Sequence, residues 1–324
     1  MTGAVLMETN QVGAPQLWCS STLLTPDVVV LAAHCIDPEI ILGLYPETTT
    51  LRFYWTPEDD VSAYDGTGLL PSDAIEAIGA VYHASYSLSG FDEGIANNHD
   101  IALLFLSEVA AIEHAYPVDL DESDQLVEEA EVIVVGWGQQ STAPDSTGEK
   151  MMGVSTVGAL GEAEFLVGPL DSDVRQCHGD SGGPVFLDVL ADTTTPLRLV
   201  GVTSHAYDET ACEEIGAVNT RIDAHLDWLD AQLRARCADG FRVWCEEPGL
   251  IFAPQAEEDE GNAVVDDGLG ASPGSGGGGK QDLSEAPAGC STTGGGAIWL
   301  LPLLLSRTRQ RWMPRTRADH DDAG

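Results

Sequence analysis

Short runs of β-branched and other apolar residues, separated by Gly, Pro, Asp and Ser, dominate the chain up to about residue 222. The clearest runs are residues 28–31, 101–106, 132–135 and 199–202. Runs at this density indicate antiparallel strands, arranged as a sandwich or as barrels. Ile222, Leu226, Leu229 and Leu233 then recur at helical spacing, which predicts one amphipathic helix that ends near Cys237 and packs on the core.

Residues 176–184, Gln-Cys-His-Gly-Asp-Ser-Gly-Gly-Pro, place a serine between glycines after a Gly-Asp pair. Such a serine sits on a tight turn, where backbone N–H groups can converge on one point and the hydroxyl is exposed. This arrangement suits acyl transfer if a base and an orienting acid occur elsewhere. His34 closes one hydrophobic run, Asp100 opens another and Ser181 follows, so the order is His, Asp, Ser.

With these three segments the chain resembles the chymotrypsin/trypsin-like serine proteases. The similarity runs from about residue 4 to residue 236 and includes the segments 19–24, 33–35, 134–138, 199–204 and 216–222. The resemblance selects barrels over a sandwich. It implies an all-β fold, a double antiparallel six-stranded β-barrel with a C-terminal helix.

The resemblance also implies an activity, that of a serine endopeptidase which hydrolyses peptide bonds through an acyl-enzyme and needs no cofactor. Ser181 would be the nucleophile, His34 its base, and Asp100 the carboxylate that fixes the imidazole tautomer. The backbone N–H groups of Gly179 and Ser181 would form the oxyanion hole. Asp180 matches the aspartate that pairs with a newly formed N-terminal amine to set the oxyanion turn. The expected partners are protein or peptide substrates, and we expect a monomer.

Two other functions are compatible with the same segments. One is a catalytically silent homologue that serves as a surface binding or adhesion module, although such homologues typically lose the serine or the histidine. The other is an interaction protein whose acidic body and spacer matter more than its cleft. Neither Ser181 nor His34 is lost here, which favours the protease.

Arg175 lies six residues before Ser181, where the family places the side chain at the base of the primary specificity pocket. An aspartate there would select Lys or Arg, so trypsin-type specificity is disfavoured. A guanidinium in the pocket would attract acidic side chains, whereas one turned outward would leave specificity to the walls. The expected wall residues are Gln176, His178, Ser204, His205, Ala206 and Gly216. His99 adjoins Asp100 on an expected loop and should face solvent.

Seven cysteines indicate an oxidising compartment if they pair. The family pattern would pair Cys19 with Cys35 and Cys177 with Cys212. Cys237 and Cys245 are close enough in sequence for a local third bond, while Cys290 stands alone. No paired Cys-x-x-Cys spacing occurs and the eight histidines are scattered along the chain, so the sequence predicts no metal site.

The chain carries 53 acidic and 14 basic residues, a formal net charge of −39, which would repel nucleic acid and anionic lipid. We expect four regions: a protease domain at 1–237, a C-terminal extension at 238–253, a flexible acidic and Gly-rich linker at 254–288, and a tail at 289–324. The linker cannot bury enough apolar surface to offset the entropy of ordering it.

The tail combines Cys290, an apolar stretch interrupted by Pro302, and three arginines at 307, 309 and 311. Twelve residues of helix cover about 18 Å, short of a bilayer core of about 30 Å. The order resembles the tripartite C-terminal sorting signals of myxobacterial surface proteins. This predicts an exported, surface-associated protein whose tail engages membrane or sorting machinery.

Only eighteen residues precede Cys19, and the first basic residue is Arg52. Mature members of the family begin with an Ile or Val about two dozen residues before this cysteine. We therefore expect either that the true start lies upstream, with a signal peptide and an activation site, or that Asp180 pairs with another cation.

Overall fold

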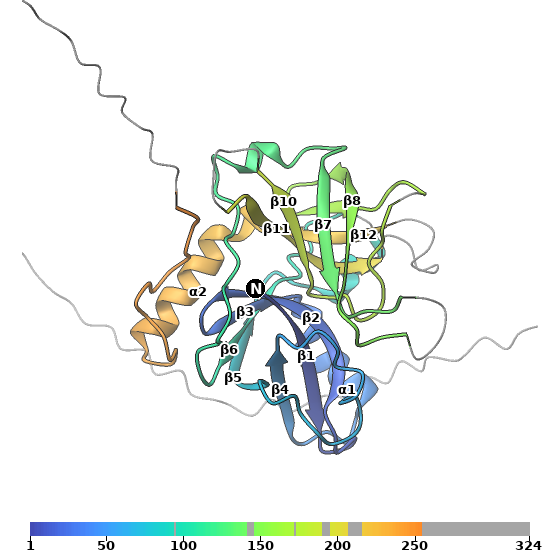
Figure 1. Ribbon diagram of the computed structural model, residues 1–324, viewed down its shortest axis with the longest axis vertical. Helices are drawn as coiled ribbons and strands as arrows, with labels where there is room; N and C mark the ends of the chain where they lie inside the picture. The colour runs from blue at the N-terminus through green and yellow to red at the C-terminus, as the bar shows by residue number, and fades with distance from the viewer. Residues whose placement is uncertain (94, 141–145, 172, 190–194, 207–215, 255–324) are drawn as a thin grey trace, which may run out of the picture. The chain divides into compact units, whose positions relative to one another are not determined.

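Two closed antiparallel barrels of six strands each make up the computed structural model, which describes residues 1–254 except 94, 141–145, 172, 190–194 and 207–215 (Figure 1). The predicted fold class, two six-stranded barrels with a C-terminal helix, is therefore confirmed. The predicted tail and, apart from Pro254, the predicted linker lie outside the described residues.

The first barrel has the strand order β1-β2-β3-β6-β5-β4. Its strands are β1 (Thr2–Thr9), β2 (Gln16–Thr25), β3 (Val28–Leu31), β4 (Leu51–Thr56), β5 (Ile75–Tyr82) and β6 (Ala102–Leu106). Every residue of β3 and β6 is buried, which explains why these two segments read as unbroken apolar runs. After the buried Ile75, β5 instead alternates between exposed and half-buried positions, as expected for a strand with one face in solvent.

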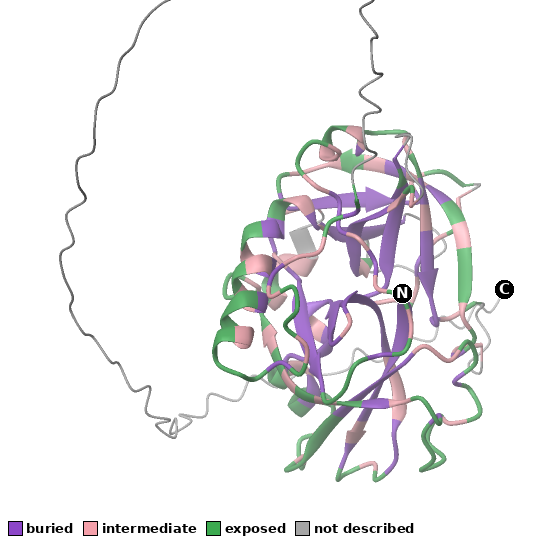
Figure 2. Ribbon diagram, turned by 60° about the vertical axis from the view of Figure 1, so that its left-hand side comes forward, coloured by how far each residue is buried: buried purple, intermediate pink, exposed green. Residues whose placement is uncertain are grey.

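The second barrel has the order β10-β11-β12-β9-β8-β7. Its strands are β7 (Glu131–Gly136), β8 (Met151–Leu160), β9 (Glu164–Val167), β10 (Pro184–Asp188), β11 (Leu197–Ala206) and β12 (Ala217–Arg221). Buried residues concentrate on the strands of both barrels, and exposed residues on the connecting segments (Figure 2). One continuous apolar cluster includes side chains from both barrels, so the two pack as one unit.

Helix α1 (Pro38–Leu44) follows β3, and helix α2 (Leu226–Ala238) follows β12. Leu226, Leu229 and Leu233 of α2 are buried, as the helical spacing predicts. The residues after α2 turn back onto the first barrel, where the Phe241 ring packs edge-on against Phe105 at 5.7 Å. No helix within the described residues is long and apolar enough to cross a membrane.

Two disulfides have both cysteines in the described part of the chain: Cys19–Cys35 and Cys237–Cys245. The first is the bond expected from the family pattern. The second settles the pairing that the sequence left open, and it closes the segment after α2. Cys177 is also disulfide-bonded, but its expected partner Cys212, like Cys290, lies outside the described residues.

Candidate active site

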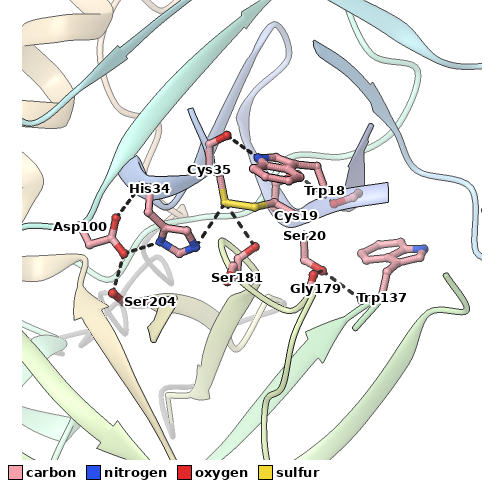
Figure 3. The surroundings of a disulfide bond; sticks show 12 residues. Trp18, Cys19, Ser20, His34, Cys35, Asp100, Trp137, Gly179, Ser181 and Ser204 are labelled. Carbon is pink, nitrogen blue, oxygen red and sulfur yellow. Dashed lines mark hydrogen bonds and ion pairs between the residues drawn. A yellow bond between two sulfur atoms is a disulfide. The ribbon is translucent and has the colours of Figure 1, made fainter. Parts of the chain in front are cut away.

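His34 and Asp100 lie at the same end of the antiparallel β3–β6 pair, where the chain leaves β3 and enters β6. His34 is in a single 3-10 turn (Ala33–Cys35), and its Nδ1 is 2.7 Å from Asp100 Oδ2 (Figure 3). The His34 backbone N–H donates to Asp100 Oδ1 at 2.9 Å. Because the carboxylate accepts from both the main chain and the ring, it fixes the position and the tautomer of the imidazole.

Asp100 is fully buried and takes a third hydrogen bond from the Ser204 hydroxyl at 2.5 Å. Burial acts to raise the pKa of Asp100. The charge of His34 and the hydrogen bonds from His34 and Ser204 outweigh burial, so the pKa is lowered and the group is ionised at neutral pH. The predicted wall residue Ser204 thus contacts Asp100 directly.

Ser181 lies on the turn before β10, and hydrogen bonds join the backbone of this turn to both barrels. The Ser20 N–H of β2 donates to the Ser181 carbonyl at 2.8 Å, and Gly182 N–H donates to Thr203 of β11 at 2.7 Å. Cys35 Sγ is 3.8 Å from both His34 Nε2 and the Ser181 carbonyl oxygen, so the disulfide packs between the two segments (Figure 3). Among the described residues no hydrogen bond joins the Ser181 hydroxyl to His34; in ligand-free enzymes, contacts of this kind are often long.

The turn before Ser181 presents two unused donors. Gly179 has φ of 95°, a conformation that favours glycine, and a Cβ at this position would crowd Gly138. Within the described structure the N–H groups of Gly179 and Ser181 donate no hydrogen bond. The Gly179 carbonyl is turned toward Ser20, whose hydroxyl donates a hydrogen bond to it at 2.9 Å. Ser20 is a residue that the sequence analysis missed.

The Asp180 carboxylate accepts hydrogen bonds from Gly138 N–H and Cys177 N–H, each at 2.8 Å. Any side chain at Gly136 or Gly138 would overlap this carboxylate, which explains why glycines flank Trp137. Burial raises the pKa of Asp180 to about 6, and no cation within the described residues compensates it. A cavity of about 350 Å³ opens beside the carboxylate.

A cleft of about 320 Å³ contains both His34 and Ser181. Five of the predicted wall residues line it: Gln176, His178, Ser204, His205 and Ala206. The sequence analysis missed Phe91, which belongs to a 3-10 segment (Leu88–Glu93) and stacks on the His205 ring at 4.6 Å. Phe91 also meets the His34 ring edge-on at 5.5 Å, so it covers the edge of the cleft.

Arg175, expected at the base of the pocket, and Gly216, the remaining expected wall residue, are not in the lining of this cleft. The Arg175 guanidinium donates to the carbonyls of Gly168 at 3.1 Å and Leu170 at 2.9 Å, and it borders the cavity beside Asp180. Neither geometry considered from the sequence, pocket floor or free in solvent, describes this position. Gly216 stands against the Val167 carbonyl, where a side chain would not fit.

A polar network lies at the base of the cleft instead. Gln176 is 6 % exposed, and its side-chain amide donates to Thr203 Oγ1 at 2.6 Å and to Asn219 Oδ1 at 3.1 Å. Asn219 returns a hydrogen bond to Gln176 Oε1 at 3.3 Å. The base of the cleft is therefore polar and uncharged.

His99 does not face solvent as expected. It is half-buried, and its Nδ1 is 3.0 Å from His225 Nε2. Burial lowers the pKa of His99 and of His83, and it lowers the pKa of His225 to about 4. All three rings are therefore neutral at pH 7.

The family model for trypsin matches residues 3–229, which include both barrels and the start of α2. The chain is 24 % identical over 244 residues to phenoloxidase-activating factor 1 of Holotrichia diomphalia and 26 % identical over 252 residues to phenoloxidase-activating factor 3 of the same species. These matches cover 69 % and 71 % of this chain and 64 % and 68 % of the two relatives.

A third relative, ovochymase of Halocynthia roretzi, is 24 % identical over 66 % of this chain, but the match covers only 13 % of ovochymase. Among solved structures, neuropsin, a serine protease from mouse brain, is 19 % identical with a TM-score of 0.49, over 69 % of this chain and 91 % of that one.

The matched family and the two barrels define a trypsin-like serine protease. The chain belongs to the trypsin family.

Proposed function

We propose that the protein is a serine endopeptidase that hydrolyses peptide bonds of protein or peptide substrates with Ser181, His34 and Asp100. The observation that carries this proposal is the contact between Asp100 and His34 at 2.7 Å, with Ser181 in the same cleft. Because the carboxylate accepts from Nδ1–H, the lone pair of His34 is on Nε2, on the side of the Ser181 segment.

In the proposed reaction the Ser181 hydroxyl attacks the carbonyl carbon of the substrate while His34 Nε2 takes its proton. The negative charge that develops on the carbonyl oxygen is stabilised by the two unused N–H groups of Gly179 and Ser181. The protonated His34 then gives its proton to the leaving amine, and the ion pair with Asp100 stabilises the imidazolium. Water, activated by the same imidazole, hydrolyses the acyl-enzyme and restores Ser181.

A fluorophosphonate probe tests this assignment directly. The probe should label Ser181 in protein processed by its native cells, and Ser181→Ala should abolish both labelling and peptide hydrolysis. Ser123→Ala, at a half-buried serine distant in sequence from the cleft, is the matched control and should keep both. Hydrolysis that survives in Ser181→Ala would refute the protease. A protein that neither labels nor hydrolyses after processing would be the silent homologue instead.

Asp180 is proposed to set the oxyanion turn through an ion pair with a newly formed terminal amine. A buried carboxylate without a cation loses several kcal/mol of solvation, which an amine in the adjoining cavity would restore. The active, processed protein should therefore carry a free Ile or Val amine at its terminus, which N-terminal sequencing of the protein from its native cells would detect. Full turnover without such a terminus would exclude this role.

The protein is further proposed to be exported and held at the cell surface by residues 289–324. The support is the order of cysteine, apolar stretch and arginines in the sequence. Removal of residues 290–324 should release the protein into the medium with its peptidase activity intact. A truncated protein that stays with the cells would contradict the anchoring role.

A further inference from the structure

Three histidines that are far apart in the sequence lie close together in the structure, beside the predicted catalytic residue Asp100. His83 follows β5, His99 immediately precedes Asp100, and His225 precedes α2. Each ring offers one nitrogen, and these three nitrogens all lie within 4.8 Å of one another. The sequence analysis found no such site because the spacings, 16 and 126 residues, match no local metal-binding pattern.

His225 is held in the manner of a metal ligand. Its Nδ1 is 2.6 Å from the Arg221 carbonyl oxygen, an acceptor only, so Nδ1 carries the proton and donates it. The lone pair is therefore on Nε2, which faces His99 Nδ1 at 3.0 Å. Histidines that bind metals typically donate their second N–H to a carbonyl or carboxylate in this way.

His99 is turned toward His225 by an uncommon backbone. Its φ is 55°, in the left-handed region, and its carbonyl accepts a 2.8 Å hydrogen bond from Ile101 N–H. The His83 ring stacks on the His99 ring at 4.6 Å, and Trp228 meets His83 edge-on at 5.3 Å. His225 is 2 % exposed, whereas His83 and His99 are half-buried, so an ion can reach the site from solvent.

We propose that His83, His99 and His225 form a binding site for a divalent transition-metal ion of the zinc class. Three imidazole nitrogens without a carboxylate suit Zn²⁺, Ni²⁺ or Cu²⁺ and do not suit Mg²⁺ or Ca²⁺, which prefer oxygen ligands. A water molecule would complete four-coordination. Metal binding breaks the hydrogen bond between His99 Nδ1 and His225 Nε2. The proton on His99 Nδ1 moves to Nε2 of the same ring, so three neutral imidazoles hold the ion.

The geometry requires a small adjustment. Zinc–nitrogen bonds of about 2.0–2.1 Å in a tetrahedron separate the ligand atoms by about 3.4 Å. The His99–His225 pair, at 3.0 Å, is already close to this separation. The three nitrogens lie within 4.8 Å of one another, so the third must approach by at most about 1.4 Å, and the His83 ring must rotate from its stacked position on His99. His83 must also give up the 3.2 Å hydrogen bond that its Nδ1 accepts from Ser85 N–H, or change tautomer. His83 is therefore the weakest of the three ligands.

The site lies next to the proposed catalytic carboxylate, because His99 and Asp100 are consecutive. Within the described residues, one other group of His and Cys side chains lies close enough together to hold a metal ion: Cys19, His34 and Cys35. Its two sulfurs are joined in a disulfide and cannot bind a metal as thiolates. The site does not depend on the proposed peptidase activity, since its ligands are distinct from His34, Asp100 and Ser181.

The test is a calorimetric titration of Zn²⁺ into the full-length chain after chelator treatment, in the presence of millimolar Mg²⁺ to occupy weak acidic sites. One equivalent should bind. His99→Ala and His225→Ala should weaken affinity at least about tenfold, the loss expected for one ligand. His83→Ala should weaken it less. His114→Ala and His34→Ala are the matched controls and should leave affinity unchanged.

A second measurement does not depend on the folding of variants. In imidazole ¹⁵N NMR of the unmodified chain, Zn²⁺ should shift three rings and leave the others in place. If no Zn²⁺ binds above the level of Mg²⁺, or if the five variants all bind as the unmodified chain does, the cluster is a hydrogen-bonded group of histidines and the proposal is wrong.

Discussion

Arg242 and Asp27 form a fully buried ion pair, in which Arg242 Nη2 lies 2.7 Å from Asp27 Oδ1. Arg242 belongs to the segment after α2, and Asp27 to the turn between β2 and β3, so the pair joins the predicted extension to the first barrel. Thr25 Oγ1 accepts from Arg242, and the backbone N–H of Trp244 donates to Asp27 Oδ2. The extension at 238–253 is therefore part of the folded unit.

Removal of Arg242 should destabilise the protein strongly. Arg242→Ala leaves the Asp27 carboxylate buried without its cation, and we expect a loss of about 3–5 kcal/mol in the free energy of unfolding. Urea denaturation in a Ser181→Ala background, which prevents self-digestion, measures this loss.

The control is Arg234→Ala. Arg234 pairs with Asp230 at 2.6 Å on the exposed side of α2, so removing its side chain should have little effect on stability. Equal effects of the two substitutions would show that the buried pair does not hold the extension. The double variant Asp27→Leu with Arg242→Met should recover part of the lost stability, because no unpaired charge remains.

Ser20 should support catalysis without touching the substrate. Its hydroxyl accepts from Trp137 N–H at 3.0 Å and donates to the Gly179 carbonyl at 2.9 Å, and this fixes the peptide that orients the proposed oxyanion hole. Ser20→Ala leaves both groups unsatisfied, so we expect kcat to fall about tenfold with KM within about twofold.

Ser21 provides the matched control, because it is the next residue of β2, is equally buried, and points to the opposite face. Its hydroxyl donates to the Gly3 carbonyl at 2.8 Å. Ser21→Ala should lower stability with little effect on kcat. If the two variants lose the same fraction of kcat, Ser20 has no special role in positioning the turn.

The barrels could be predicted from the sequence because the buried strands β3 and β6 leave unbroken apolar runs, and because three motif segments resemble one family. The side-chain direction of Arg175 could not be predicted, since it depends on the carbonyls of Gly168 and Leu170, which no motif marks. The histidine cluster was missed for a similar reason: its members meet only when the β5–β6 connection packs against the start of α2.

Glu164 should make stability depend on pH. It is buried, and burial raises its pKa to about 7; Ala96 N–H donates to one carboxylate oxygen at 2.7 Å, while the other has no hydrogen-bond partner. Because the folded-state pKa lies above the unfolded value, folding favours the protonated form. The stability from this group is complete below about pH 4.5 and is lost as the pH rises through about 7.

Glu164→Gln should therefore have little effect on Tm near pH 4.5 and should raise Tm relative to the unmodified chain at pH 8. The expected rise is about 2–4 °C for each kcal/mol of the burial cost removed. Glu162→Gln, a nearby exposed carboxyl that accepts from Asn97, is the control and should show no such trend. A Tm difference that stays constant from pH 4.5 to pH 8 would show that Glu164 is ionised throughout.

The proposed peptidase should cleave after uncharged side chains. No carboxylate lines the described part of the cleft that contains Ser181, so a substrate Lys or Arg would find no counterion there. The Arg175 guanidinium is held by the Gly168 and Leu170 carbonyls, so it would not attract acidic side chains into the cleft. The polar lining residues Gln176 and Thr203, which are hydrogen-bonded to each other, would select for size and hydrogen bonding instead.

A peptide-library profile measures this preference, and two variants separate the alternatives. Arg175→Ala should leave the ranking of substrates unchanged, because the guanidinium lies outside the cleft. Gln176→Ala should enlarge the base of the cleft and shift cleavage toward larger apolar side chains, by about 1–3 kcal/mol in kcat/KM discrimination. Strong cleavage after Lys or Arg by the unmodified protein would refute the neutral pocket. A preference for Asp or Glu that disappears in Arg175→Ala would place the guanidinium in the cleft when substrate binds.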